Sequence, residues 1–158
     1  MSTPTRRPLL SAATVIGIGM GGFVDGILFH QLLQVHNMLS ARVPPRESIP
    51  NMEVNMFWDG LFHTFTWAAT AIGIWLLFRA ARRPDVLWDG RVMIGGVLLG
   101  AGLFNLVEGL LNHHVLQIHH VVETHGLSLW DWGFLLSGVV LIVVGVLLAR
   151  SPQAAVSH

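Results

Sequence analysis

The chain has 158 residues, of which 53% are hydrophobic and only 11% are charged. Average soluble domains carry about 25% charged residues, so this composition fits an integral membrane protein better than a soluble one. The formal net charge of zero provides no basic surface for nucleic acid. The absence of cysteine excludes disulfides, iron–sulfur clusters and thiolate metal sites, while nine histidines are many for so apolar a chain.

Four segments are long and apolar enough to cross a bilayer, which takes about 20 mostly apolar residues. In chain order they cover roughly 9–34, 57–78, 92–111 and 129–149. We therefore predict a single all-α integral membrane domain over residues 1–158, a bundle of four transmembrane helices in contact with the lipid bilayer. Residues 151–158 are expected to form a disordered tail.

The arginines are distributed unevenly between the two sides of the predicted membrane domain. Seven of the nine precede the first span, cluster between the second and third spans, or follow the fourth. The other two lie in the first connection together with two glutamates, and the third connection has none. The positive-inside rule therefore places both termini and the middle connection in the cytoplasm. The first and third connections are expected to face outward.

Two stretches nearly repeat one another: "FVDGILFHQLLQVH" at 23–36 and "LVEGLLNHHVLQIH" at 106–119. "WDGLFH" at 58–63 likewise matches "WDWGFL" at 130–135. Because each copy would cross the membrane twice, we predict a tandem duplication of a two-helix unit, with a pseudo-two-fold axis along the membrane normal.

Histidines and carboxylates from all four spans are predicted to reach the same depth, near the outward-facing boundary. An ionisable residue inside a span costs about 2.5–3.5 kcal/mol on insertion scales, so these residues tend to face the bundle interior and find partners. One interpretation is polar pairing that holds the helices together. We favour a metal site, since histidine and carboxylate are ligands for zinc, copper and iron.

The predicted metal site has three parts. The main ligands are expected to be His30, Asp59, His63 and His113. Asp25 and Glu108 would bridge or orient them, with Asp131 as a hydrogen-bonding partner. A second cluster at the mouth would contain His36, His119 and His120, and His114 is a further histidine of the second copy.

Helical spacing constrains which of these side chains can meet. Asp59 and His63 are four residues apart and share a helix face. His30 is rotated by about 140° from Asp25 on an ideal helix. Either the helix carries a π-bulge near Gly26, or the two residues face different neighbours, and the same holds for Glu108 and His113.

Copper is the first choice of metal, because Cu(II) binds most strongly in the Irving–Williams order and thiolate is absent. Zinc and iron are the other candidates. A b-type haem between His30 and His113, a proton relay, and a structural subunit of a larger complex are the alternatives to a metal ion. Enzyme status stays open, and a homo-oligomer is compatible with the sequence.

Three stretches carry a resemblance to a known family: "GMGGFVDGILFHQLLQVHNML" at 19–39, "FWDGLFHTFTW" at 57–67 and "NLVEGLLNHHVLQIHHV" at 105–121. They resemble an uncharacterised bacterial membrane-protein family, domain of unknown function 2243. The resemblance implies a four-helix protein of the bacterial inner membrane and supplies no catalytic residues. It also implies a respiratory or assembly complex as partner, since relatives are encoded near oxidase assembly proteins, which favours copper or haem.

Overall fold

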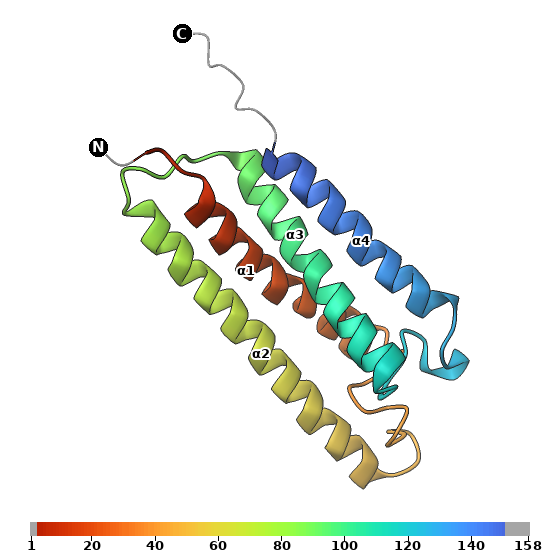
Figure 1. Ribbon diagram of the computed structural model, residues 1–158. Coiled ribbons are helices and arrows are strands. Elements are labelled where there is room, and N and C mark those ends of the chain that lie inside the picture. The colour runs from red at the N-terminus through yellow and green to blue at the C-terminus, as the bar shows by residue number, and fades with distance from the viewer. Residues whose placement is uncertain (1–2, 151–158) are drawn as a thin grey trace.

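The computed structural model describes residues 3–150 and consists of four long helices, α1 to α4 (Figure 1). They span Arg7–Val24 (α1), Ile49–Ala81 (α2), Gly90–Glu108 (α3) and Leu129–Arg150 (α4). Two π-helices, η1 (Asp25–Leu32) and η2 (Gly109–Val115), continue α1 and α3, and a short 3₁₀ helix, η3 (Glu123–His125), precedes α4. The predicted tail at 151–158 lies outside the described residues.

Each of the four helical rods is long and apolar enough to cross a membrane, with α1 and α3 counted together with their π-helices. The predicted all-α fold with four membrane spans is therefore confirmed. The helix that contains the predicted span 57–78 begins earlier, at Ile49. Ser48 accepts a hydrogen bond from the backbone N–H of Asn51, and Pro50 occupies the first turn, which together start the helix before the apolar stretch.

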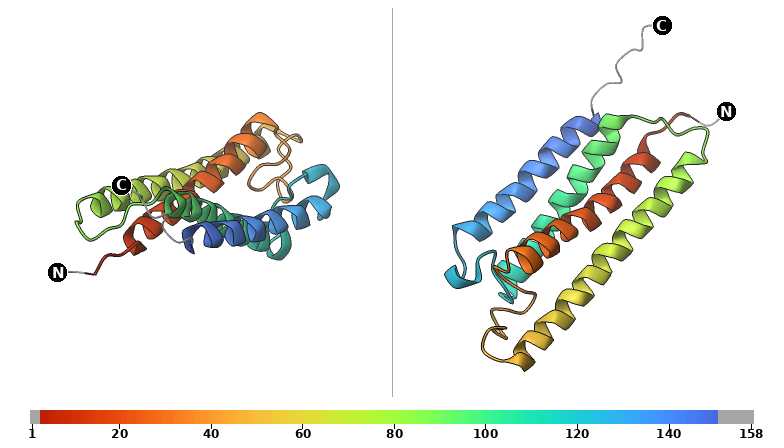
Figure 2. Two further views of the ribbon diagram at one scale, coloured as in Figure 1. Left: turned by 90° about the horizontal axis from the view of Figure 1, so that it is seen from above. Right: turned by 180° about the vertical axis from the view of Figure 1, so that it is seen from behind.

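The helices pack as a row in the order α2, α1, α3, α4, with α1 and α3 in the middle (Figure 1). The described ends of the chain and the connection from α2 to α3 lie at one end of this row, as Figure 2 also shows. The connections 33–48 and 116–128 lie at the opposite end, which we call the loop end. The faces of α2 and α4 carry many exposed apolar side chains, which suits contact with lipid.

Glycines allow the two central helices to approach closely. A side chain at Gly17 would collide with the carbonyl oxygen of Val97 in α3, and one at Gly100 would collide with the carbonyl oxygen of Thr14 in α1. Small residues at such crossings are typical of helix packing in membranes, where apolar burial between helices gives no hydrophobic gain. This close contact fixes the position of the two π-helices at the loop end.

We expect Gly100→Ala to lower the midpoint of thermal unfolding in detergent, measured by circular dichroism. Its methyl group meets backbone of α1, and overpacking of this kind costs about 1–3 kcal/mol. Gly60→Ala in α2 is the matched control, because a Cβ there meets no atom within 4 Å. The control should unfold at the parent temperature or above, and equal midpoints for both variants would contradict this packing.

Candidate metal centre

The two π-helices bring each acidic residue of the repeated stretch next to the histidine five positions later. Asp25 Oδ2 lies 3.3 Å from His30 Nε2, and Glu108 Oε1 lies 3.3 Å from His113 Nε2. On a regular α-helix these pairs would diverge. Of the two alternatives that the sequence left open, the structure shows the π-helical one in both stretches. π-Helical segments are frequent at functional sites.

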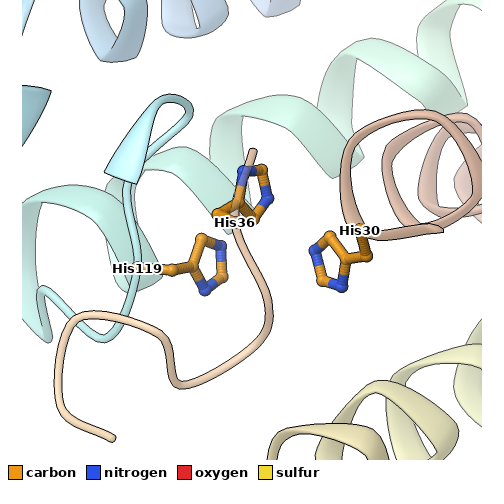
Figure 3. Close-up of side chains that lie close together, drawn as sticks. All are labelled: His30, His36 and His119. Atoms are coloured by element: carbon orange, nitrogen blue, oxygen red, sulfur yellow. The ribbon is translucent and has the colours of Figure 1, made fainter. Parts of the chain in front are cut away.

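A sharp turn after each π-helix folds a second histidine back toward the first. Gln34 has φ 50° and Gln117 has φ 47°, a left-handed conformation that is uncommon for residues other than glycine. The chain then returns beneath the helix ends, so that His36 and His119 reach the interior of the loop end. Figure 3 shows His36 and His119 beside each other and close to His30.

Four imidazoles are thereby packed together and shielded from solvent. His30, His36, His113 and His119 are each at most 2% exposed. Ring centroids lie 4.6 Å apart for His30 and His36, 4.8 Å for His36 and His119, and 4.9 Å for His113 and His119. The two histidine clusters expected from the sequence are therefore one cluster, which we call the histidine centre.

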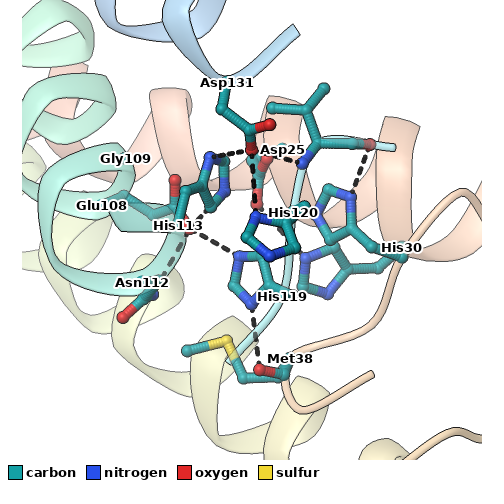
Figure 4. Close-up of polar contacts among 12 residues, drawn as sticks. Asp25, His30, Met38, Glu108, Gly109, Asn112, His113, His119, His120 and Asp131 are labelled. Carbon is teal, nitrogen blue, oxygen red and sulfur yellow. Dashed lines mark hydrogen bonds and ion pairs between the residues drawn. The ribbon is translucent and has the colours of Figure 1, made fainter. Parts of the chain in front are cut away.

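The Nδ1 atom of each ring contacts an acceptor outside the histidine centre; Figure 4 shows the contacts of His119 with Met38 and of His113 with Asp131. His36 Nδ1 donates to the carbonyl of Val121 at 3.0 Å, and His119 Nδ1 donates to the carbonyl of Met38 at 2.9 Å. The other two contacts are with carboxylates. His30 Nδ1 lies 3.0 Å from Asp59 Oδ1, and His113 Nδ1 lies 3.1 Å from Asp131 Oδ1.

The same two carboxylates also hold the loops. The backbone N–H of Met38 donates to Asp59 at 2.8 Å, and that of Val121 donates to Asp131 at 3.0 Å. Asn37 donates a further hydrogen bond to Asp59 at 2.7 Å. The expected role of Asp131 as a hydrogen-bonding partner is therefore confirmed.

With Nδ1 anchored, the Nε2 atoms face the interior of the histidine centre. Those of His30, His36 and His113 have no hydrogen-bond partner among the described residues, although two of them lie near a carboxylate at 3.3 Å. One oxygen of Asp25 and one of Glu108 also lack a partner. Buried polar atoms without partners are rare, and each costs about 1–3 kcal/mol, so such a concentration points to a ligand.

The pKa values of the two loop histidines shift in opposite directions. Burial, together with repulsion from His119 and His30, lowers the pKa of His36 to about 2, so its Nε2 keeps a free lone pair. Burial acts in the same direction on His119. Its hydrogen bond to Glu108, at 2.7 Å, and the charge of that carboxylate outweigh burial and raise the pKa of His119.

Two sets of potential ligand atoms lie within metal-binding reach. His30, His36 and His119 form one set, and Glu108, His113 and His119 form the other, with the atoms of each set within 4.8 Å of one another. A metal ion needs ligand atoms that converge to about 2.0–2.2 Å from it, which small side-chain adjustments provide at these separations. The chemistry is that of imidazole nitrogen with carboxylate oxygen.

Five of the sequence-predicted ligands lie outside these sets: Asp25, Asp59, His63, His114 and His120. His63 Nδ1 donates to the backbone carbonyl of Asp59 at 2.8 Å, so the pair predicted to chelate one ion does not form a chelate. His114 Nδ1 donates to the carbonyl of Gly109, and its ring contacts Trp132. His120 lies 3.6 Å from Asp131, at the edge of the histidine centre.

Asn55 is a supporting residue that extends the helix face of Asp59 and His63. It is 1% exposed, accepts a hydrogen bond from the backbone N–H of Leu39, and donates to the carbonyl of Val43. Its position one helical turn before Asp59, on the same face of α2, was the available signal. Asn55 and Asp59 together pin the first loop over the histidine centre.

Two cavities adjoin the histidine centre. One of about 650 Å³ includes His30 and Asp59 in its lining together with exposed side chains such as Gln34 and Arg46, so it connects the centre with the surface of the loop end. The other, of about 510 Å³, is lined mainly by apolar side chains of α1, α2 and α3 and extends to Glu108. The first cavity thus carries several polar side chains between His30 and the surface.

Comparison with known proteins identifies the family without assigning an activity. No curated protein and no solved structure matches the chain significantly. The profile of a family described as "Predicted membrane protein (DUF2243)" matches residues 12–152, which include most of α1, the whole of α2 to α4, and the histidine centre. The chain therefore belongs to this family of predicted membrane proteins.

Proposed function

We propose that the protein binds metal through the histidine centre within the membrane. One observation carries this proposal. Four buried imidazoles each have Nδ1 in contact with a fixed acceptor and Nε2 turned toward a shared interior. Metal-ligating histidines have this arrangement, because the contact at the second nitrogen fixes the tautomer and the ring orientation.

A purely structural network accounts less well for the same residues. Polar groups that only hold helices together are stabilising when each finds a partner. Here the Nε2 atoms of His30, His36 and His113 lack a hydrogen-bond partner among the described residues. On the outer side, Nδ1 is hydrogen-bonded in three of the four rings, and that of His113 lies 3.1 Å from Asp131. A proton relay would also need ionisable groups along the whole helix length. The halves of the four helices that lie away from the histidine centre are apolar, so a continuous proton relay through this chain is not supported.

Copper remains the preferred ion, with zinc and iron as the other candidates. The donor set is imidazole and carboxylate without thiolate, and Cu(II) binds such donors most strongly among the divalent first-row ions.

A b-type haem fits less well. Its macrocycle would lie between two facing axial histidines, but His36 and His119 pack between His30 and His113. Bound copper would serve redox chemistry, or metal handling for a respiratory or assembly complex.

The location that goes with this function is the outward side of a bacterial inner membrane. Arginine is concentrated in the connection between α2 and α3, at the end opposite the histidine centre. The positive-inside rule supports cytoplasmic termini, so the polar cavity at His30 would open outward. Metal would then enter from outside the cytoplasm.

We also propose that the chain arose by tandem duplication. The contacts recur in pairs: His36 with Val121 corresponds to His119 with Met38, and the contact of His30 with Asp59 corresponds to that of His113 with Asp131. Both copies also contain a π-helix followed by a glutamine of positive φ. These repeated details support a pseudo-two-fold axis through the histidine centre.

The combined variant His36→Ala, His119→Ala tests the metal proposal. We expect the purified parent protein, loaded with copper and washed, to retain copper in stoichiometric amount. The variant should retain at least tenfold less, because it loses the two rings that lie between the other ligands. Elemental analysis per mole of chain gives the result.

His125→Ala is the matched control for this variant. His125 lies in the same connection as His119 but is exposed and belongs to neither ligand set. It should retain the parent amount of copper. Copper retention by the combined variant at the parent level would rule out the histidine centre as the site, and a parent protein that binds neither copper, zinc nor iron would refute the proposed function.

Single cysteines test the orientation, since the chain has none of its own. Thr124→Cys lies in the connection before α4, and Pro84→Cys lies between α2 and α3, both at exposed positions. In intact spheroplasts a membrane-impermeant maleimide should label Thr124→Cys at least tenfold more than Pro84→Cys. Permeabilisation should make the two equal, and the reverse pattern would contradict cytoplasmic termini.

A further inference from the structure

We infer that the histidine centre holds two metal ions, one on each repeat. The first ion would be bound by His30 and His36 with Asp25, and the second by His113 and His119 with Glu108. This inference rests on the proposed function and adds the number of ions and the division of ligands between them. The orientation of the four imidazole rings supports two separate ions.

The nitrogens of His36 and His119 lie within 4.8 Å of each other, but the stacked orientation of the two rings does not aim their lone pairs at one ion. Their planes are parallel within 3°, with centroids 4.8 Å apart, which is closer than two coplanar rings can approach edge to edge. They therefore lie in separate parallel planes. Because the lone pair of an imidazole nitrogen lies in the plane of its ring, two such rings direct their lone pairs along separate planes that do not meet at an ion.

Within each repeat the rings are oriented to converge. His30 stands at 72° to His36 with centroids 4.6 Å apart, and His113 stands at 73° to His119 with centroids 4.9 Å apart. Two imidazoles on one ion, with metal–nitrogen distances of about 2.0–2.1 Å, place their centroids about 5 Å apart. The distances between repeats are longer, 5.9 Å for His30 and His119 and 6.3 Å for His36 and His113.

One carboxylate is available to each histidine pair. Asp25 lies 3.3 Å from Nε2 of His30, while Glu108 lies 3.3 Å from Nε2 of His113 and 2.7 Å from Nε2 of His119. Both carboxylates are buried and keep one oxygen without a partner. Two nitrogens and one carboxylate make a set of three protein ligands for a divalent ion with an open position. In the second repeat Glu108, His113 and His119 already lie within 4.8 Å of one another. In the first repeat Asp25 lies beside His30 and would have to turn toward His36 to complete the same set.

The approximate symmetry argues against a single shared ion. His36 contacts Val121 in the same way as His119 contacts Met38. The pseudo-two-fold axis that relates these two contacts therefore passes between the stacked rings. One ion bound equally by both repeats would have to lie on that axis, between two parallel ring faces, where no lone pair points. Two ions, one on each side of the stack, satisfy the rings of both repeats.

The number of ions per chain, measured with copper alone, tests the inference. The copper-loaded parent should contain two ions per chain, and His30→Ala and His113→Ala should each contain one. His114→Ala, in the same π-helix as His113 but with its ring bonded outside the ligand sets, should contain two. One ion in the parent would overturn the two-ion inference and leave the proposed function in place, whereas no ion in the parent would overturn both.

Electron paramagnetic resonance on the parent protein tests the same inference without variants, so the result does not depend on whether a variant folds. Two Cu(II) ions in neighbouring half-sites should couple magnetically, so the electron paramagnetic resonance signal should integrate to much less than the copper content. An uncoupled mononuclear signal that integrates to the whole copper content at full loading would contradict the paired arrangement.

Discussion

The reciprocal hydrogen bonding of two loop residues, Met38 and Val121, organises the loop end. Each backbone N–H donates to a carboxylate on one outer helix, and each carbonyl accepts from a histidine of the opposite repeat. The two loops therefore cannot adopt their positions independently. The same four bonds that close the protein over its polar interior also set the ring orientations of His36 and His119.

The row of helices makes this arrangement possible. Because α1 and α3 cross at glycines, their π-helical ends lie side by side, with α2 and α4 supplying Asp59 and Asp131 from the outer positions. An aspartate buried beside a membrane boundary is costly without partners. Here each accepts backbone and side-chain hydrogen bonds, so the cost is offset by contacts that also orient a histidine.

The four spans could be predicted from the sequence, because hydrophobic length is a strong signal in membrane proteins. The mismatch between helical spacing and the repeated acid and histidine left two alternatives, of which the π-helix is the one observed. The entry of His36 and His119 into the centre could not be foreseen. It depends on left-handed turns at Gln34 and Gln117, and glutamine is not a residue type that signals such a turn.

The prediction that Asp59 and His63 chelate one ion illustrates a second limit. The four-residue spacing does place them on one face of α2, but the carboxylate is already engaged by His30, Asn37 and the backbone of Met38. His63 donates instead to a backbone carbonyl of its own helix. The spacing along α2 therefore correctly placed Asp59 and His63 near each other. The partners that engage the Asp59 carboxylate instead, His30, Asn37 and Met38, come from a segment distant in sequence.

X-ray absorption at the copper edge tests most directly whether imidazole nitrogens of the histidine centre bind the metal. For the copper-loaded protein we expect a first shell of nitrogen and oxygen, with the outer-shell scattering that is characteristic of several imidazoles. A first shell of oxygen alone, without imidazole scattering, would contradict it.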